Sequence, residues 1–150
     1  MNLSQNFTLA QLTFSQTAAR LGIDNTPGPE IIEHLTAVAV GLERVQQLLG
    51  HPILISSGYR SPALNASIPG SAKTSAHMEG WAADFTCEKF GDPMAVCKAI
   101  SESELMFDQL ILEYGRWAHI SFKPPMRRRT LTIYNAQQGY LLGLVEPTPK

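Results

Sequence analysis

SAHMEGWAADF, residues 75–85, is an apolar segment interrupted by a histidine and acids, and WAHIS, residues 117–121, places a second histidine in a similar setting. A buried carboxylate is costly unless it is paired or bound to a metal, and Asp84 has no basic neighbour in the sequence. Zinc accepts imidazole nitrogen and carboxylate oxygen, and catalytic zinc sites typically leave a fourth position to water. Such a water can lose a proton near neutral pH and attack a carbonyl. His77, Asp84 and His119 are therefore predicted ligands of Zn²⁺ in a hydrolase.

The patterns along the chain predict an α+β fold, with N-terminal helices packed on a mostly antiparallel central sheet that bears the zinc site. Gly80 allows the turn that His77 and Asp84 need if both are to face one ion. A capping box opens the first helix and apolar residues at helical spacing mark the second. The predicted helices are 8–20, 29–49 and 93–101, the predicted strands are 52–56, 81–86, 107–114, 117–122, 130–134 and 140–145, and 61–73 is predicted to be a loop. The strand 52–56 is expected to be buried, and the last two strands are expected to be edge strands.

The 150 residues are predicted to form a single domain, which is large enough to bury about 70% of the surface that the unfolded chain exposes. The net charge of −1 argues against a dedicated nucleic-acid binder. The only basic run, Arg127 to Arg129, is interpreted as a solvated entry to a strand. Cys87 and Cys97 lack the spacing of a CxxC motif and are expected to be buried free thiols.

The N-terminus shows no signal peptide, and no apolar run is long enough to span a membrane. We therefore expect the protein to be made in the cytoplasm. It would reach a cell wall only through a phage-type route, such as a holin, lysis or a virion. The sequence carries no indication of an oligomeric state.

Four motifs occur in order along the chain: SSGYRSP (56–62), Leu64-Asn65, HMEGWAAD (77–84) and WAH (117–119). Together they resemble the zinc D-Ala-D-Ala carboxypeptidase family of peptidoglycan peptidases, which shares a superfamily with the hedgehog signalling domain. The opening segment is similar to the phage and prophage branch, which makes the chain endolysin-like. The resemblance covers roughly residues 7–135 and implies that residues 1–150 form a single zinc metallopeptidase domain. Such an enzyme would cleave a bond next to a D-residue in the peptidoglycan stem peptide, either at a terminal D-Ala or inside the stem.

The general base is where the sequence departs from the family pattern. Relatives have an acid three positions before the last histidine, and that position here is Arg116. The nearest acid is Glu113, which a turn over residues 115–117 would place directly across from His119. A two-residue turn would instead point Glu113 away from the ion. The alternative role for Glu113 is a carboxylate at the rim that pairs with Arg116.

Asp108 and Glu79 are weaker substitutes for this base. If no carboxylate serves, the protein is instead a non-catalytic zinc module that binds cell wall or protein, a second function that the hedgehog branch permits.

Four residues are candidates for substrate binding. By resemblance, Arg60 orients the substrate through its carboxylate or its scissile carbonyl, because a guanidinium pairs bidentately with a carboxylate. The alternative for Arg60 is a structural salt bridge. Ser75 is placed to hydrogen-bond the substrate backbone, while Trp117 and Tyr59 are expected either to wall the cleft or to belong to the core.

Overall fold

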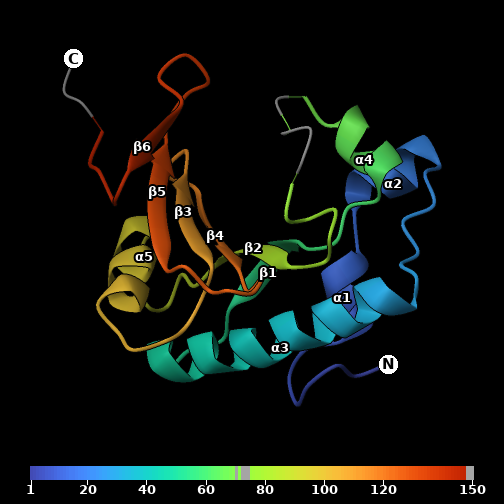
Figure 1. Cartoon of the computed structure of the whole chain (residues 1–150), viewed down its shortest axis with the longest axis horizontal. Coiled ribbons are helices and arrows are strands. Elements are labelled where there is room, and N and C mark those ends of the chain that lie inside the picture. Colours follow the sequence, from blue (N-terminus) through green and yellow to red (C-terminus); the bar gives the residue numbers. More distant parts are fainter. Residues whose placement is uncertain (70, 72–74, 148–150) are drawn as a thin grey trace.

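The computed structural model describes residues 1–69, 71 and 75–147 and has the predicted α+β architecture (Figure 1). The long helix α3 runs beneath the sheet in this view, and α5 lies beside the sheet. No helix in the described residues is long and apolar enough to cross a membrane. The helices are α1 (Leu9–Thr13), α2 (Gln16–Leu21), α3 (Pro29–Leu49), α4 (Pro62–Ser67) and α5 (Pro93–Ser101), and the strands are β1 (Leu54–Ser57), β2 (Ala82–Thr86), β3 (Gln109–Glu113), β4 (Trp117–Ser121), β5 (Arg129–Ile133) and β6 (Tyr140–Leu142).

The six strands form one sheet in the order β1-β2-β4-β3-β5-β6. Every neighbouring pair is antiparallel except β3 and β5, which run parallel. The prediction of a mostly antiparallel sheet is therefore confirmed. The segment that forms β5 was predicted to be an edge strand, and this is wrong, because β6 returns alongside it and takes the edge position.

The two faces of the sheet differ in what covers them. Alternate side chains of β2, β3 and β4, including Phe85, Leu110 and Ile120, enter the main hydrophobic core. Helix α3 packs on β2 and α5 packs on β3 and β4, so both helices supply the other side of this core. Because side chains alternate along a strand, the residues between these core positions point to the opposite face, where the predicted ligands lie.

The N-terminal helical region is divided into two helices rather than the single predicted one. The capping box at Thr8 and Gln11 is present as predicted. However, Phe14 and Ser15 both have extended backbones, and the Ser15 side chain caps a new helix by accepting from the Ala18 amide. The sequence contains this second start signal, since serine is a favoured N-cap residue.

Two further predictions are wrong in detail. Part of the segment predicted to be a loop is helix α4, which begins after Ser61 because its hydroxyl accepts from the Leu64 amide and Pro62 occupies the first helical turn. Residues 70, 72 and 73 of that predicted loop lie outside the described residues. Strand β1 is not buried throughout: it is an edge strand, and Leu54 on it is 69% exposed.

We expect Gly41→Ala to destabilise the protein although alanine is the better helix former. A Cβ at position 41 of α3 would overlap the ring of Phe122. Overpacking typically costs about 1–3 kcal/mol, which outweighs a gain of about 1 kcal/mol in helix propensity. Chemical denaturation should show a loss of about 1 kcal/mol in the free energy of unfolding. In a Phe122→Leu background the same substitution should be neutral or stabilising, and an equal loss in both backgrounds would contradict the overlap.

Candidate metal centre

The site begins with a cross-strand pair on the open face of the sheet. Asp84 of β2 is the direct antiparallel partner of His119 of β4. Their core-facing neighbours, such as Ala83 and Ala118, lie on the other side of the sheet. Both polar side chains are buried, and His119 Nδ1 lies 3.0 Å from Asp84 Oδ1. The strand register therefore brings the carboxylate and the imidazole together.

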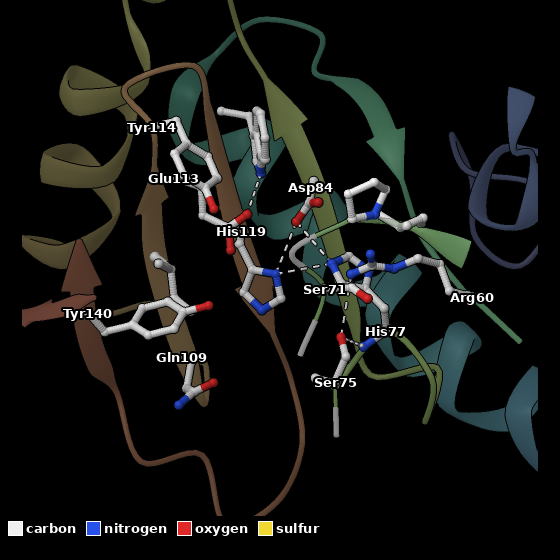
Figure 2. A pocket seen from close by; sticks show the side chains of 15 residues that line it. Arg60, Ser71, Ser75, His77, Asp84, Gln109, Glu113, Tyr114, His119 and Tyr140 are labelled. Atoms are coloured by element: carbon white, nitrogen blue, oxygen red, sulfur yellow. Dashed lines mark hydrogen bonds and ion pairs between the residues drawn. The ribbon is translucent and has the colours of Figure 1, made fainter. Parts of the chain in front are cut away.

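His77 completes the cluster from the turn that precedes β2 (Figure 2). Gly80 closes this turn with a φ of 76°, a conformation that glycine adopts without strain. His77 Nε2 lies 3.1 Å from Asp84 Oδ1 and 3.2 Å from His119 Nδ1. On the other side of the ring, His77 Nδ1 donates to the Gly58 carbonyl at 2.7 Å. Because a carbonyl can only accept, the neutral ring has its Nε2 lone pair facing the cluster.

The donor set fits a zinc ion. Two imidazole nitrogens and one carboxylate oxygen are common zinc ligands, and atoms about 2.0–2.1 Å from a tetrahedral zinc lie about 3.3 Å apart. The three ligand atoms of His77, Asp84 and His119 are separated by 3.0–3.2 Å. A cation held between these atoms would compensate the buried charge of the Asp84 carboxylate. These residues could therefore hold a metal ion.

Electrostatics keep the Asp84 carboxylate ionised. Burial acts to raise the pKa of Asp84, but the His77 and His119 side chains outweigh it and hold that pKa below its ordinary value. Burial also acts to lower the pKa of His119, while its hydrogen bond to Asp84 and the charge there raise that pKa above its ordinary value. A metal ligand must be deprotonated to bind, so a metal ion and a proton would compete for His119.

Glu113 lies on the same face as His119, but the predicted register is wrong. Its partner on β4 is Trp117, and the residue opposite His119 is Ile111. The turn consists of residues 114–116, with positive φ at Tyr114 and Gly115. The observed pairing is offset from the predicted one by an even number of residues, so the side chain of Glu113 stays on the metal face.

A hydrogen bond holds the Glu113 carboxylate in place. Trp117 Nε1 donates to Glu113 Oε2 at 2.6 Å. Burial raises the pKa of Glu113 above its ordinary value and the Asp84 charge adds to this, whereas His119 and the Trp117 hydrogen bond oppose it. In the described part of the chain, Glu113 makes no ion pair with Arg116 and its Oε1 has no hydrogen-bond partner.

Arg60 and Ser75 lie on the other side of the ligands and contact each other. Arg60 Nη2 donates to Ser75 Oγ at 3.4 Å, and the same oxygen accepts from the His77 amide at 3.1 Å. Burial lowers the pKa of Arg60, against the effect of the Asp84 charge, although a guanidinium stays protonated in proteins. Among the described residues, Arg60 Nε is buried without a hydrogen-bond partner. The predicted alternative of a structural salt bridge finds no acidic partner there.

The structure does not bring Tyr59, Asp108 or Glu79 to the site. Tyr59 packs into the hydrophobic core, where its ring is 7% exposed. Asp108 accepts two hydrogen bonds from the guanidinium of Arg127, and Glu79 pairs with Lys123 at 2.9 Å. Neither acid can therefore replace Glu113 as the carboxylate beside the ligands.

The ligands, Glu113 and Arg60 line one cleft with a volume of about 250 Å³. Several further residues that line the cleft were missed in the sequence, among them Gln109, Ile111, Tyr114 and Tyr140. The first two could have been found, because they precede Glu113 at the two-residue spacing of one strand face. Tyr140 could not, because it reaches the cleft only through the pairing of β6 with β5.

His34 of α3 supports the site indirectly, because it contacts the segment that connects His77 to β2. Its ring stacks on Trp81 with centroids 4.0 Å apart, and its Nδ1 donates to the Glu79 carbonyl at 2.6 Å. Both contacts fall on the turn that leads from His77 into β2. His34 therefore has a structural role.

The arginine run and the cysteines belong to the scaffold. Arg127 binds Asp108, and Arg128 covers the ring of Phe107 with its guanidinium carbon 4.7 Å from the ring centroid. The run is therefore more than a solvated strand entry. Cys87 and Cys97 are buried free thiols, as predicted.

A family model described as Peptidase M15 matches residues 5–121 of the chain. No curated protein sequence matches the chain. The matched region contains the three candidate ligands, Arg60 and Glu113, and it ends at β4. The strands β5 and β6 lie beyond it. Family membership points to a metal-dependent peptidase and agrees with the donor set of the cluster.

We expect one zinc ion per chain, lost on substitution of either histidine. His77→Ala and His119→Ala each remove one of three ligands, so both should bind zinc far more weakly. His51→Ala is the matched control, because His51 is exposed and lies outside the cluster. Metal content after dialysis, measured by elemental analysis with circular dichroism to check folding, tests this. Stoichiometric zinc in both ligand variants would exclude the assignment.

Proposed function

The chain belongs to the peptidase M15 family, and from this premise we propose that it is a zinc-dependent peptidase that hydrolyses a bond next to a D-residue in the stem peptide of peptidoglycan. The observation that supports the proposal best is the convergence of His77 Nε2, Asp84 Oδ1 and His119 Nδ1 at one wall of a cleft that also contains a carboxylate and a guanidinium. A peptidase needs these groups together, whereas a structural zinc site needs only a closed set of ligands.

His77, Asp84 and His119 would hold the zinc. When bound, zinc acts as a Lewis acid toward a carbonyl oxygen and lowers the pKa of water. The protein keeps its ligands fixed by the contacts already described, chiefly the hydrogen bond from His77 Nδ1 to Gly58. Such outer partners orient a histidine ligand and set which nitrogen is available.

Glu113 is the proposed general base. Its Oε2 is held by Trp117, and this leaves Oε1 available to take a proton from the attacking water. The same oxygen can then give that proton to the nitrogen of the leaving group, so that the peptide bond breaks with release of a neutral amine rather than an amide anion. The indole donor fixes the rotamer of the carboxylate, which keeps the base in position between the two transfers.

Arg60 is the proposed anchor for the substrate. Its buried Nε lacks a partner among the described residues, and leaving a buried donor unpaired typically costs about 1–3 kcal/mol. A carboxylate or carbonyl oxygen of the substrate would satisfy it. Ser75 Oγ accepts from Arg60, so its own hydroxyl proton remains available for the peptide backbone. Trp117 forms part of the cleft wall.

We also propose that the chain acts as one metallopeptidase domain. The strands β5 and β6 follow the matched region, yet they continue the same sheet, and Tyr140 of β6 lines the cleft. Action on a cell wall, reached through a phage-type route or after lysis, is part of this proposal.

A digest tests the proposed reaction directly. Pure zinc-loaded protein incubated with peptidoglycan should release new amino groups, and a chelator should abolish this. Mass analysis of the products identifies the bond: free D-Ala means a carboxypeptidase, and shortened or uncoupled stems mean an endopeptidase. Adsorption to the wall without new amino groups would refute hydrolysis and favour a non-catalytic wall-binding module, for which the arginine at position 116 is the supporting feature.

We expect Glu113→Gln to retain zinc and fold while losing activity by roughly 10²–10⁴-fold, because the amide keeps the shape of the side chain but cannot accept a proton. The Trp117 hydrogen bond can persist to the amide oxygen. Glu79→Gln is the matched control, since Glu79 is an exposed acid paired with Lys123, and such pairs contribute little. Turnover of the Glu113 variant within a few fold of the parent would refute the role of Glu113.

A further inference from the structure

Tyr140 is the part of the cleft that neither the sequence motifs nor the family match covers. It lies on the edge strand β6, beyond the matched residues 5–121. It nevertheless lines the same cleft as Glu113, His119 and Arg60. Its position there results from a continuous row of paired residues, in which Glu113 pairs with Ile133 and Ile133 pairs with Tyr140.

The hydroxyl of Tyr140 faces the cleft from the side opposite Arg60. Figure 2 shows the Tyr140 ring pointing inward toward His119, while Arg60 enters from beyond His77. A peptide that passes over the three ligands would therefore meet Arg60 at one end and Tyr140 at the other. Within the described residues, no hydrogen-bond partner occupies the Tyr140 hydroxyl.

The chemistry of a phenol at this place suits a backbone acceptor. A tyrosine hydroxyl keeps its proton at neutral pH and can donate it. Burial raises the pKa of Tyr140, and Glu113, Tyr114 and Asp84 add to the rise while Arg60 opposes it. Ile111, Leu131 and Ile133 form a small apolar cluster on the face of the sheet that carries Tyr140, and these side chains offer no hydrogen-bond acceptor.

We propose that Tyr140 is a substrate-binding residue whose hydroxyl donates a hydrogen bond to a backbone carbonyl oxygen of the stem peptide, on the side of the scissile bond opposite the part held by Arg60. The inference rests on the proposed peptidase function and extends it to a strand outside the family match. This hydrogen bond forms before the chemical step and persists through it. It therefore contributes to substrate binding and not to the rate at which the bound substrate reacts.

The test compares Tyr140→Phe, which removes only the hydroxyl, with Tyr140→Ala, which also removes the ring. Leu142→Ala is the matched control, because Leu142 lies on the same strand, is 80% exposed and is not part of the cleft. A neutral hydrogen bond contributes about 0.5–1.5 kcal/mol. We therefore expect Tyr140→Phe to raise KM about 2- to 10-fold with kcat nearly unchanged, the pattern of a lost uniform binding contact.

Binding is measured separately, so that the inference and the proposed function can fail independently. Soluble muropeptides with uncross-linked and cross-linked stems are titrated by calorimetry into zinc-loaded Glu113→Gln protein, with and without Tyr140→Phe. Binding weakened about 2- to 10-fold by Tyr140→Phe supports the inference even if the parent protein cleaves nothing. Equal binding and equal KM with and without the hydroxyl overturn it while leaving the peptidase function intact. Absence of binding by the Glu113→Gln protein overturns the inference, and the peptidoglycan digest decides separately whether the peptidase function stands.

Discussion

The antiparallel pairing of Asp84 with His119 is the constraint on which the rest of the structure depends. Because side chains alternate along a strand, the register that joins these two polar groups also directs Ala83, Phe85 and Ile120 into the core. A slip of one residue would bury the carboxylate against α3 and α5 and expose the apolar side chains. The hydrophobic core therefore stabilises the same register that the candidate metal site requires.

The third candidate ligand, His77, is positioned by other contacts than the strand pairing that positions Asp84 and His119. His77 lies in a turn, where no ladder of strand hydrogen bonds can hold it. Its ring is fixed by the carbonyl of Gly58, at the end of β1, and the following backbone is held by the ring and Nδ1 of His34 on α3. A Cβ at Gly58 would overlap the backbone of Leu12, so the helix α1 is packed directly behind the acceptor of this hydrogen bond. The N-terminal helices thus position a ligand that they do not contain.

The cleft separates its charges in a way that suits peptide hydrolysis. The carboxylate of Glu113 and the guanidinium of Arg60 lie on different sides of the ligands and do not pair with each other in the described structure. Each instead contacts a neutral group, the indole of Trp117 or the hydroxyl of Ser75. Had the two charges paired, the base would lose its proton affinity and the cation its capacity to bind substrate. Neutral partners orient both groups and leave their charges available.

The sequence by itself determined the longest helix, the start of the first helix and the candidate chemistry: the apolar stripe of α3, the capping box at Thr8, and three polar groups in apolar surroundings that predicted the zinc ligands. These signals are local, since they depend on spacing within one helix, turn or strand. Only the folded structure decided the pairing of Glu113 with Trp117, the burial of Tyr59, the parallel insertion of β5 and the arrival of Tyr140 at the cleft. The first of these is the register of a hairpin, and the other three result from pairing or packing between segments distant in the chain. In each case several arrangements are compatible with the same local pattern, and only the packing of the whole core selects one.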